Sequence, residues 1–230
     1  MKRFYETVTV ESTPEGFRFL LDAKPVRTPA RQPLLLPSRA LAEAVAEEWR
    51  EQGEEMRPEG MPLTRLVNTV LDGVRSTRAD VAAAILRFGE NDLLAYRAEA
   101  PEELAARQRQ WDDYLQWAAE RHGARLTVTS GIGPVEQPPQ ALEALRRAVT
   151  GRSDFDLAAL HVLTSITGSL VLGLAVLDGR LTAEDAFGLS RLDETYQAEQ
   201  WGADSEAEQR ATRLAAEMRH AARLIVLSRA

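Results

Sequence analysis

The hydrophobic pattern of the chain changes its period near residue 38, and this change constrains the fold more than any other feature. Residues 5–10 are rich in β-branched and aromatic side chains, a Thr-Pro-Glu-Gly turn follows at 13–16, and residues 17–21 are again mostly apolar. Two such runs around a short turn predict a β-hairpin. Prolines at positions 29, 33 and 37 restrict a further short strand, expected at 32–37, to a sheet edge.

From residue 38 onward, apolar side chains recur at helical spacing. We expect one helix that begins at Ser38 and another that begins at Thr77. Further helices are expected at residues 101–122, 139–149, 156–177 and 182–201, and a last helix begins at Ser205. The pattern predicts an α+β fold, in which a small β-rich N-terminal domain precedes an all-α helical bundle. We expect the first domain, which also holds two helices, at residues 1–97 and the second at 98–230.

Composition argues against several classes of partner and cofactor. The chain of 230 residues carries 28 Lys and Arg against 35 Asp and Glu, a formal net charge of −7, which disfavours nucleic-acid binding. It has no cysteine, which excludes disulfides, thiolate metal sites and thiol nucleophiles. The apolar stretch 157–177 holds a histidine and several hydroxyl residues, so it predicts a packed helix rather than membrane insertion.

Catalytic and metal-binding signatures are scarce. His122, His161 and His220 lack metal-ligand spacing, and no P-loop, nucleophile elbow or complete dinucleotide fingerprint occurs. We expect His161 to be a hydrogen-bonded core residue and the other two to lie at the surface, with no catalytic residue, metal or cofactor. The alternative is a hydrolase that uses Asp193 and Glu194 with His161. It requires a pocket that brings these side chains within hydrogen-bond reach, and a shifted carboxyl pKa.

The segment 191–202 is the strongest candidate for a functional surface. Asp193, Tyr196 and Gln197 share one helical face, and Glu194 and Trp201 lie on the neighbouring face. Spacing alone permits two interpretations. One is a solvated helix with a single buried aromatic residue; the other is a protein-binding face with an aromatic anchor and carboxylates.

Two further features lie in the N-terminal half. Trp49 is the last apolar residue of an amphipathic helix, for which core packing is the expected role. In the Met-Pro-Leu lead into residues 64–69, Arg65 and Asn68 are three residues apart on one helical turn, where they can order a loop or contact a partner. We expect Trp49, Arg65 and Asn68 to give structural support.

Several short motifs, taken together, resemble the Atp12 family of chaperones for the alpha subunit of the ATP synthase catalytic head. The motifs are KRFY (2–5), PVRTPA (25–30), EW (48–49), MPLTRL (61–66), DLLAYR (92–97), Gln108 with Trp111, GSLVL (168–172) and YQAEQWG (196–202). The resemblance covers essentially the whole chain. It implies a β-rich N-terminal domain, a helical C-terminal domain and a protein that is not an enzyme.

The resemblance also implies a partner and a site. Family members bind the unassembled alpha subunit and cover the surface that the beta subunit later occupies, without hydrolysing ATP and without a cofactor. The functionally sensitive acidic position of the family falls on Asp193, where many relatives have glutamate, and its sensitive tryptophan falls on Trp49. The predicted partner-binding residues are Asp193, Glu194, Tyr196, Gln197, Glu199 and Trp201.

The remaining expectations concern assembly and compartment. We expect a monomer. The first family motif begins at residue 2, which favours a protein of the bacterial cytoplasm. A mature form in the mitochondrial matrix is the alternative. A structural scaffold subunit is the other alternative function, and it differs from a chaperone by staying in the finished complex.

Overall fold

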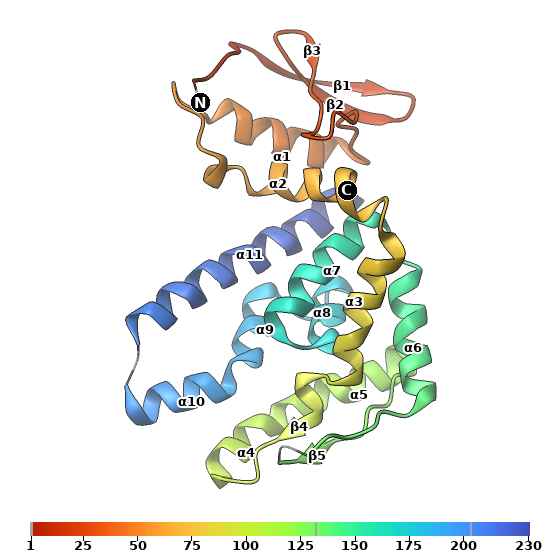
Figure 1. Cartoon of the computed structure of the whole chain (residues 1–230), viewed down its shortest axis with the longest axis vertical. Helices are drawn as coiled ribbons and strands as arrows, with labels where there is room; N and C mark the ends of the chain where they lie inside the picture. The colour runs from red at the N-terminus through yellow and green to blue at the C-terminus, as the bar shows by residue number, and fades with distance from the viewer. Residues whose placement is uncertain (1, 132, 203) are drawn as a thin grey trace. The chain divides into compact units, whose positions relative to one another are not determined.

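The computed structural model describes residues 2–131, 133–202 and 204–230 (Figure 1). The strands are β1 (Val8–Thr13), β2 (Gly16–Leu21), β3 (Lys24–Pro25), β4 (Tyr96–Arg97) and β5 (Thr129–Ser130). The α-helices are α1 (Arg39–Arg50), α2 (Pro62–Thr69), α3 (Arg78–Glu90), α4 (Glu102–Gln108), α5 (Asp112–His122), α6 (Pro139–Thr150), α7 (Asp154–Thr167), α8 (Leu170–Leu177), α9 (Ala183–Ser190), α10 (Leu192–Trp201) and α11 (Ser205–Arg229). The predicted α+β fold, with a small N-terminal sheet before a mostly helical remainder, is confirmed.

The chain divides into two compact units. Unit 1 contains residues 1–78, 154–159 and 220–230, and unit 2 contains residues 79–153 and 160–219. The first division therefore falls at residue 78, whereas the sequence suggested a domain boundary at residue 97. That domain boundary stays a prediction. Unit 1 is discontinuous, because the first part of α7 and the last part of α11 belong to it.

The hairpin predicted near the N-terminus is confirmed as β1 and β2. The two strands pair antiparallel from Val8 opposite Leu21 to Thr13 opposite Gly16, and β3 adds to β2 on the other side. Helix α1 packs on β1 and β2, with Leu41 and Val45 fully buried. Ser38 caps α1 as predicted, since its hydroxyl oxygen accepts a hydrogen bond of 3.0 Å from the Leu41 N–H. Residues 32–37 form no strand and make only isolated bridges to the hairpin region.

The turn between β2 and β3 holds two non-glycine residues in the left-handed region. Asp22 has φ 47° and Ala23 has φ 64°. Aspartate tolerates this conformation, but alanine places its Cβ close to the following carbonyl oxygen, at a cost of about 1–2 kcal/mol. The turn therefore carries backbone strain at Ala23.

Replacing Ala23 by glycine is expected to raise the free energy of unfolding by about 0.5–1 kcal/mol. Glycine removes the strain, and its extra freedom in the unfolded chain offsets part of the gain. Urea unfolding monitored by circular dichroism measures the change. Ala183, which is helical and buried at 4% exposure, is the matched control. Its replacement by glycine has no strain to relieve, so it is expected to destabilise; equal effects at both sites would contradict the prediction.

The prediction of one long central helix at residues 156–177 is wrong, because the chain turns between α7 and α8. Gly168 has φ 67°, which is the left-handed region, and Ser169 caps α8 by accepting from the Leu172 N–H at 3.0 Å. The glycine that allows α7 and α8 to pack closely is Gly173. A Cβ there would lie 2.6 Å from the Thr164 hydroxyl oxygen.

The helix expected at 182–201 is also interrupted, at Arg191. Thr182 caps α9 as predicted, but Arg191 adopts φ −115° and ψ 23°, which ends α9 and separates it from α10. The break leaves α10 as a separate helix of ten residues, closed by Gly202 at φ 94°. Among the described residues, none of the helices combines the length and apolar character that crossing a membrane requires.

Candidate functional site

Helix α10 carries the predicted partner-binding residues and packs within unit 2 against α4. Gln108, at the end of α4, donates a hydrogen bond of 2.7 Å from Nε2 to Oδ1 of Asp193. The Gln108 side chain is 1% exposed, and its Oε1 accepts from the Ala98 N–H at 2.7 Å. The two hydrogen bonds fix the amide, so Gln108 holds Asp193 in one orientation. Oδ2 of Asp193 makes no hydrogen bond with a described residue.

Arg107 makes the second connection between the two helices. Its guanidinium pairs with Glu199 at 2.7 Å and with Glu103 at 2.8 Å, and it lies 5.2 Å from the ring centroid of Tyr196. Tyr196 is 9% exposed and is the aromatic residue that α10 buries. Asp193, Tyr196 and Glu199 thus contact α4, and they orient the rest of the helix.

The opposite face of α10 is open to solvent. Glu194, Gln197 and Trp201 are exposed and lie three and seven residues apart, on one helical face. Trp201 is 79% exposed, the largest value among the exposed large apolar side chains of the described residues. Within the described residues, the ion pair that Glu194 forms is with Arg191, at 3.6 Å, and such an exposed pair contributes little to stability. We name this surface, formed by Glu194, Gln197 and Trp201, the α10 face.

Trp49 lies in unit 1, where it ties α1 to the N-terminal segment and to α2. Its ring lies 5.6 Å from those of Tyr5 and Phe19, and its Nε1 donates to the Thr64 hydroxyl at 3.2 Å. The Tyr5 hydroxyl donates to the Trp49 carbonyl at 2.7 Å. These contacts are of the kind that structural support requires.

The neighbour of Trp49 provides the cap for α2. Glu48 is 7% exposed and accepts hydrogen bonds from the N–H groups of Leu63 (2.7 Å) and Thr64 (2.8 Å) and from the Thr64 hydroxyl (2.8 Å). Helix α2 has no capping side chain of its own. Burial raises the pKa of Glu48, and the hydrogen bonds from Thr64 and Leu63 oppose that rise. Glu48 was not among the predicted site residues, although it stands beside Trp49 in the EW motif (48–49).

Arg65 and Asn68 differ from Trp49 in their surroundings. Arg65 is exposed, and its guanidinium makes no hydrogen bond or ion pair with a described residue. Asn68 is half-buried, and its Oδ1 is buried without a hydrogen-bond partner among the described residues. Polar side-chain contacts with the described residues therefore give no support to the structural role predicted for Arg65 and Asn68, and that role stays a prediction.

A second buried carboxylate lies at the start of α8. Asp92 is fully buried and accepts hydrogen bonds of 3.0 Å from the N–H groups of Leu94 and Val171. Burial raises the pKa of Asp92 to about 6, against the opposing effect of hydrogen bonds from Ser169 and the backbone. The sequence offered only a weak signal for this group, because its partners at the start of α8, unlike Leu94, are more than 70 residues away.

The arrangement required by the hydrolase alternative is not found. His161 is exposed, which corrects its predicted place in the core. It lines a shallow pocket of about 610 Å³ with Arg87, Asn91 and Ser165, and neither Asp193 nor Glu194 is part of that lining.

The position of His122 also differs from its prediction. His122, expected at the surface, has a side chain only 9% exposed, with Nε2 3.1 Å from a carboxylate oxygen of Asp178. Burial acts to raise the pKa of Asp178, but His122 and Arg152 outweigh it and lower the pKa. Within residues 2–131, 133–202 and 204–230, no group of three or more His, Cys, Asp or Glu is arranged to hold a metal ion.

Comparisons with known proteins agree on one family. The family model described as ATP12 chaperone protein matches residues 2–119. The crystal structure of Atp12 from Paracoccus denitrificans superposes with a TM-score of 0.96 at 45% identity, covering 99% of this chain and 98% of that one. A crystal structure from Agrobacterium tumefaciens superposes with a TM-score of 0.91 at 47% identity, covering 98% of this chain and 85% of that one. The mitochondrial protein atp12 of Schizosaccharomyces pombe is 23% identical over an alignment of 219 residues. The alignment covers 90% of this chain and 75% of that protein.

Proposed function

Because the chain belongs to the ATP12 chaperone family, we propose that it binds the unassembled alpha subunit of ATP synthase and shields the surface that the beta subunit later covers. The family is one of chaperones rather than enzymes and acts in ATP synthase assembly. An unassembled ring subunit exposes apolar interface, the kind of surface that aggregates unless it is covered. Reversible covering requires a binding surface on the chaperone and no chemical step.

The observation that best supports this proposal is the α10 face. A tryptophan exposed at 79% is costly to leave in water and is the residue type most enriched at binding hot spots. Glu194 and Gln197 lie on the same face of the helix, and α4 holds that helix in place through Gln108 and Arg107. The α10 face therefore combines an apolar anchor with a polar rim, which is the usual anatomy of a transient interface.

Substitutions on the α10 face are expected to weaken capture of isolated alpha subunit. Trp201→Ala and Glu194→Lys remove the anchor and reverse a rim charge, and each is expected to reduce affinity roughly 10-fold or more. Asp193→Lys is expected to do the same and also to lose the hydrogen bond from Gln108. Pull-down with purified alpha subunit, followed by titration calorimetry, measures the effect.

Thr195→Lys is the matched control, because Thr195 is exposed on the same helix and is not among the predicted contacts. Its capture of alpha subunit is expected to stay near that of the wild-type chain. Circular dichroism verifies that each variant is folded. If the folded wild-type chain does not capture alpha subunit, the proposed partner is wrong; if Trp201→Ala and Glu194→Lys bind normally, the proposed site is wrong.

A chaperone and a scaffold subunit differ in what happens after assembly. We propose transient binding by a monomeric chain, so the protein is expected in complexes with free alpha subunit and absent from purified, complete ATP synthase. Quantitative mass spectrometry of both fractions distinguishes the two. For the compartment we propose the bacterial cytoplasm, supported by the similarity to the Paracoccus and Agrobacterium proteins.

A further inference from the structure

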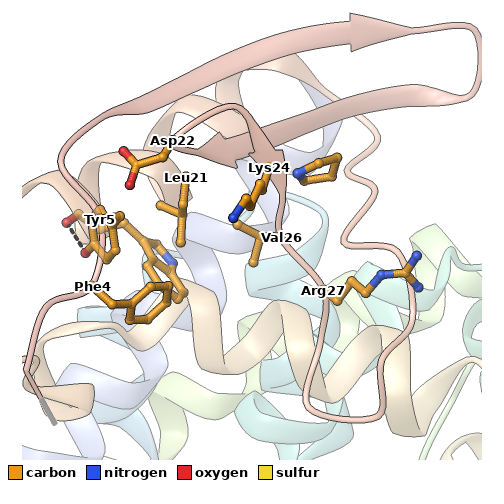
Figure 2. A pocket seen from close by; sticks show the side chains of 9 residues that line it. Phe4, Tyr5, Leu21, Asp22, Lys24, Val26 and Arg27 are labelled. Carbon is orange, nitrogen blue, oxygen red and sulfur yellow. Dashed lines mark hydrogen bonds between the residues drawn. The ribbon is translucent and has the colours of Figure 1, made fainter.

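Unit 1 contains a pocket of about 390 Å³ that the proposed alpha-subunit site does not use. Figure 2 shows it between the N-terminal segment, the β2–β3 turn and α1, with Phe4 and Tyr5 toward one side and Lys24 and Arg27 toward the other. All of its lining residues belong to residues 1–78.

One side of the pocket is aromatic and rigid. Phe4 meets Tyr5 edge to face at 5.3 Å, and Tyr5 lies 5.6 Å from Trp49. The Tyr5 hydroxyl and the Trp49 Nε1 both donate to groups of unit 1, at 2.7 and 3.2 Å, so these hydrogen bonds hold both side chains in position. Phe4 remains 63% exposed at the rim. This side therefore fits an apolar side chain rather than a polar one.

The other side of the pocket is basic. Lys24 and Arg27 are exposed, and neither forms an ion pair with a described residue; Arg27 only donates to the Arg31 carbonyl at 2.9 Å. The lining also holds one acidic residue, Asp22, whose Oδ1 accepts from the N–H groups of Thr7 (2.9 Å) and Glu6 (3.0 Å). These hydrogen bonds and the charge of Lys24 lower the pKa of Asp22, so its carboxylate stays charged. The lining therefore carries two positive charges against one negative charge, and Figure 2 shows Arg27 well away from Asp22.

This local charge is opposite in sign to that of the chain as a whole. Residues 1–37 carry six Lys or Arg against four Asp or Glu, a formal charge of +2, whereas residues 38–230 carry 22 against 31, or −9. A basic pocket in an acidic protein favours an anionic ligand, but it also attracts the acidic surfaces of other copies of the chain. The aromatic side must therefore add to the selection.

We propose that this pocket binds an extended, acidic segment of a partner protein, with one large apolar side chain against Phe4, Tyr5 and Trp49 and carboxylates at Lys24 and Arg27. Figure 2 shows Phe4 and Tyr5 at one end, Arg27 at the other end and Lys24 between them, so a segment that reaches both ends is extended. The β2–β3 turn, with its strained Ala23, places Lys24 at the opening. The pocket is a second interaction site, independent of the α10 face.

The test uses the full chain and fluorescein-labelled peptides. The probe is Asp-Glu-Phe-Glu-Asp; the comparison peptides are Lys-Lys-Phe-Lys-Lys and Asp-Glu-Ala-Glu-Asp. Fluorescence anisotropy is expected to show the probe binding roughly 10-fold more tightly than either, and more weakly at about 0.5 M than at about 0.05 M salt. Equal binding of all three peptides, or no binding of the probe, would overturn the proposal.

Variants assign the binding to the pocket. Lys24→Glu with Arg27→Glu is expected to weaken probe binding roughly 10-fold, and Phe4→Ala roughly 5-fold. Arg31→Glu is the matched control, because Arg31 is exposed in the same basic segment outside the pocket, and it is expected to bind the probe like the wild type. A loss as large in Arg31→Glu as in the pocket variants would show nonspecific attraction and overturn the proposal.

One other occupant is a second copy of this chain. Light scattering of the wild type and of Phe4→Ala decides this case. Self-association that disappears in Phe4→Ala would assign the pocket to a dimer interface and overturn the proposal, whereas a monomer in both supports a separate acidic partner.

Discussion

At pH 4, replacing Asp92 by alanine is expected to lower the free energy of unfolding by about 4 kcal/mol. The substitution leaves the N–H groups of Leu94 and Val171 without their partner in a fully buried place, and each unsatisfied donor costs about 1–3 kcal/mol. Urea unfolding of both proteins measures the difference. Glu90→Ala, an exposed acidic neighbour, is the control and is expected to change stability by less than about 0.5 kcal/mol.

The same substitution is expected to cost less as the pH rises. The folded-state pKa of Asp92 is about 6, above the usual 3.8, so the folded protein binds more protons than the unfolded chain between these values. The contribution of Asp92 is then fully present below pH 3.8 and decreases through pH 6, by roughly 3 kcal/mol in total. A difference between wild type and Asp92→Ala that stays constant or grows from pH 4 to pH 7 would contradict the raised pKa.

Replacing Glu48 by alanine is expected to lower the free energy of unfolding by about 3 kcal/mol at pH 5. Two N–H groups at the start of α2 and the Thr64 hydroxyl lose their acceptor, and α2 has no other capping side chain. Glu48→Gln keeps one acceptor oxygen and is expected to cost about half as much. Because burial raises its pKa, the contribution of Glu48 decreases as the pH rises through its folded-state pKa.

Glu47 provides the matched control for Glu48. It is the preceding residue of α1, exposed and paired only with Arg50, so Glu47→Ala is expected to change stability by less than about 0.5 kcal/mol. Thermal and urea unfolding measure the loss of stability in the three variants. The loss is expected to be largest for Glu48→Ala, smaller for Glu48→Gln and smallest for Glu47→Ala. Similar losses for Glu47→Ala and Glu48→Ala would refute the capping role.

Local sequence signals predicted those elements whose ends are set by nearby residues. The β1–β2 hairpin follows from its alternating pattern and turn, and α1 and α9 begin at the caps Ser38 and Thr182. The break between α7 and α8 was missed although its local part, Gly168 followed by the cap Ser169, stands in the sequence. Its other part is not local, because Asp92 accepts from the Val171 N–H at the start of α8 and lies 79 residues away.

The candidate site was predictable only in part, because spacing along the sequence shows which residues share a helical face but not which residues on another helix they contact. Spacing grouped Asp193 with Tyr196 and Gln197. The first two contact α4, whereas Gln197 is exposed on the α10 face. Spacing could not show that Gln108 and Arg107 hold the first two, because those partners lie on another helix. His161 was misplaced because an apolar neighbourhood in sequence was taken for a buried one; α7 exposes one side, and His161 is on it.

The discontinuity of unit 1 has a consequence for the order of events during synthesis. The Ser38 hydroxyl donates to the Leu227 carbonyl, and Arg229 pairs with Asp156 at 2.8 Å, so residues at the two ends of the chain complete one unit. A ribosome delivers residues 1–78 before residues 220–230, so the early part of unit 1 stays incomplete while the residues between them are made. Until α11 emerges, the apolar residues of unit 1 lack part of their packing partners, which is the condition in which a nascent chain is prone to aggregate.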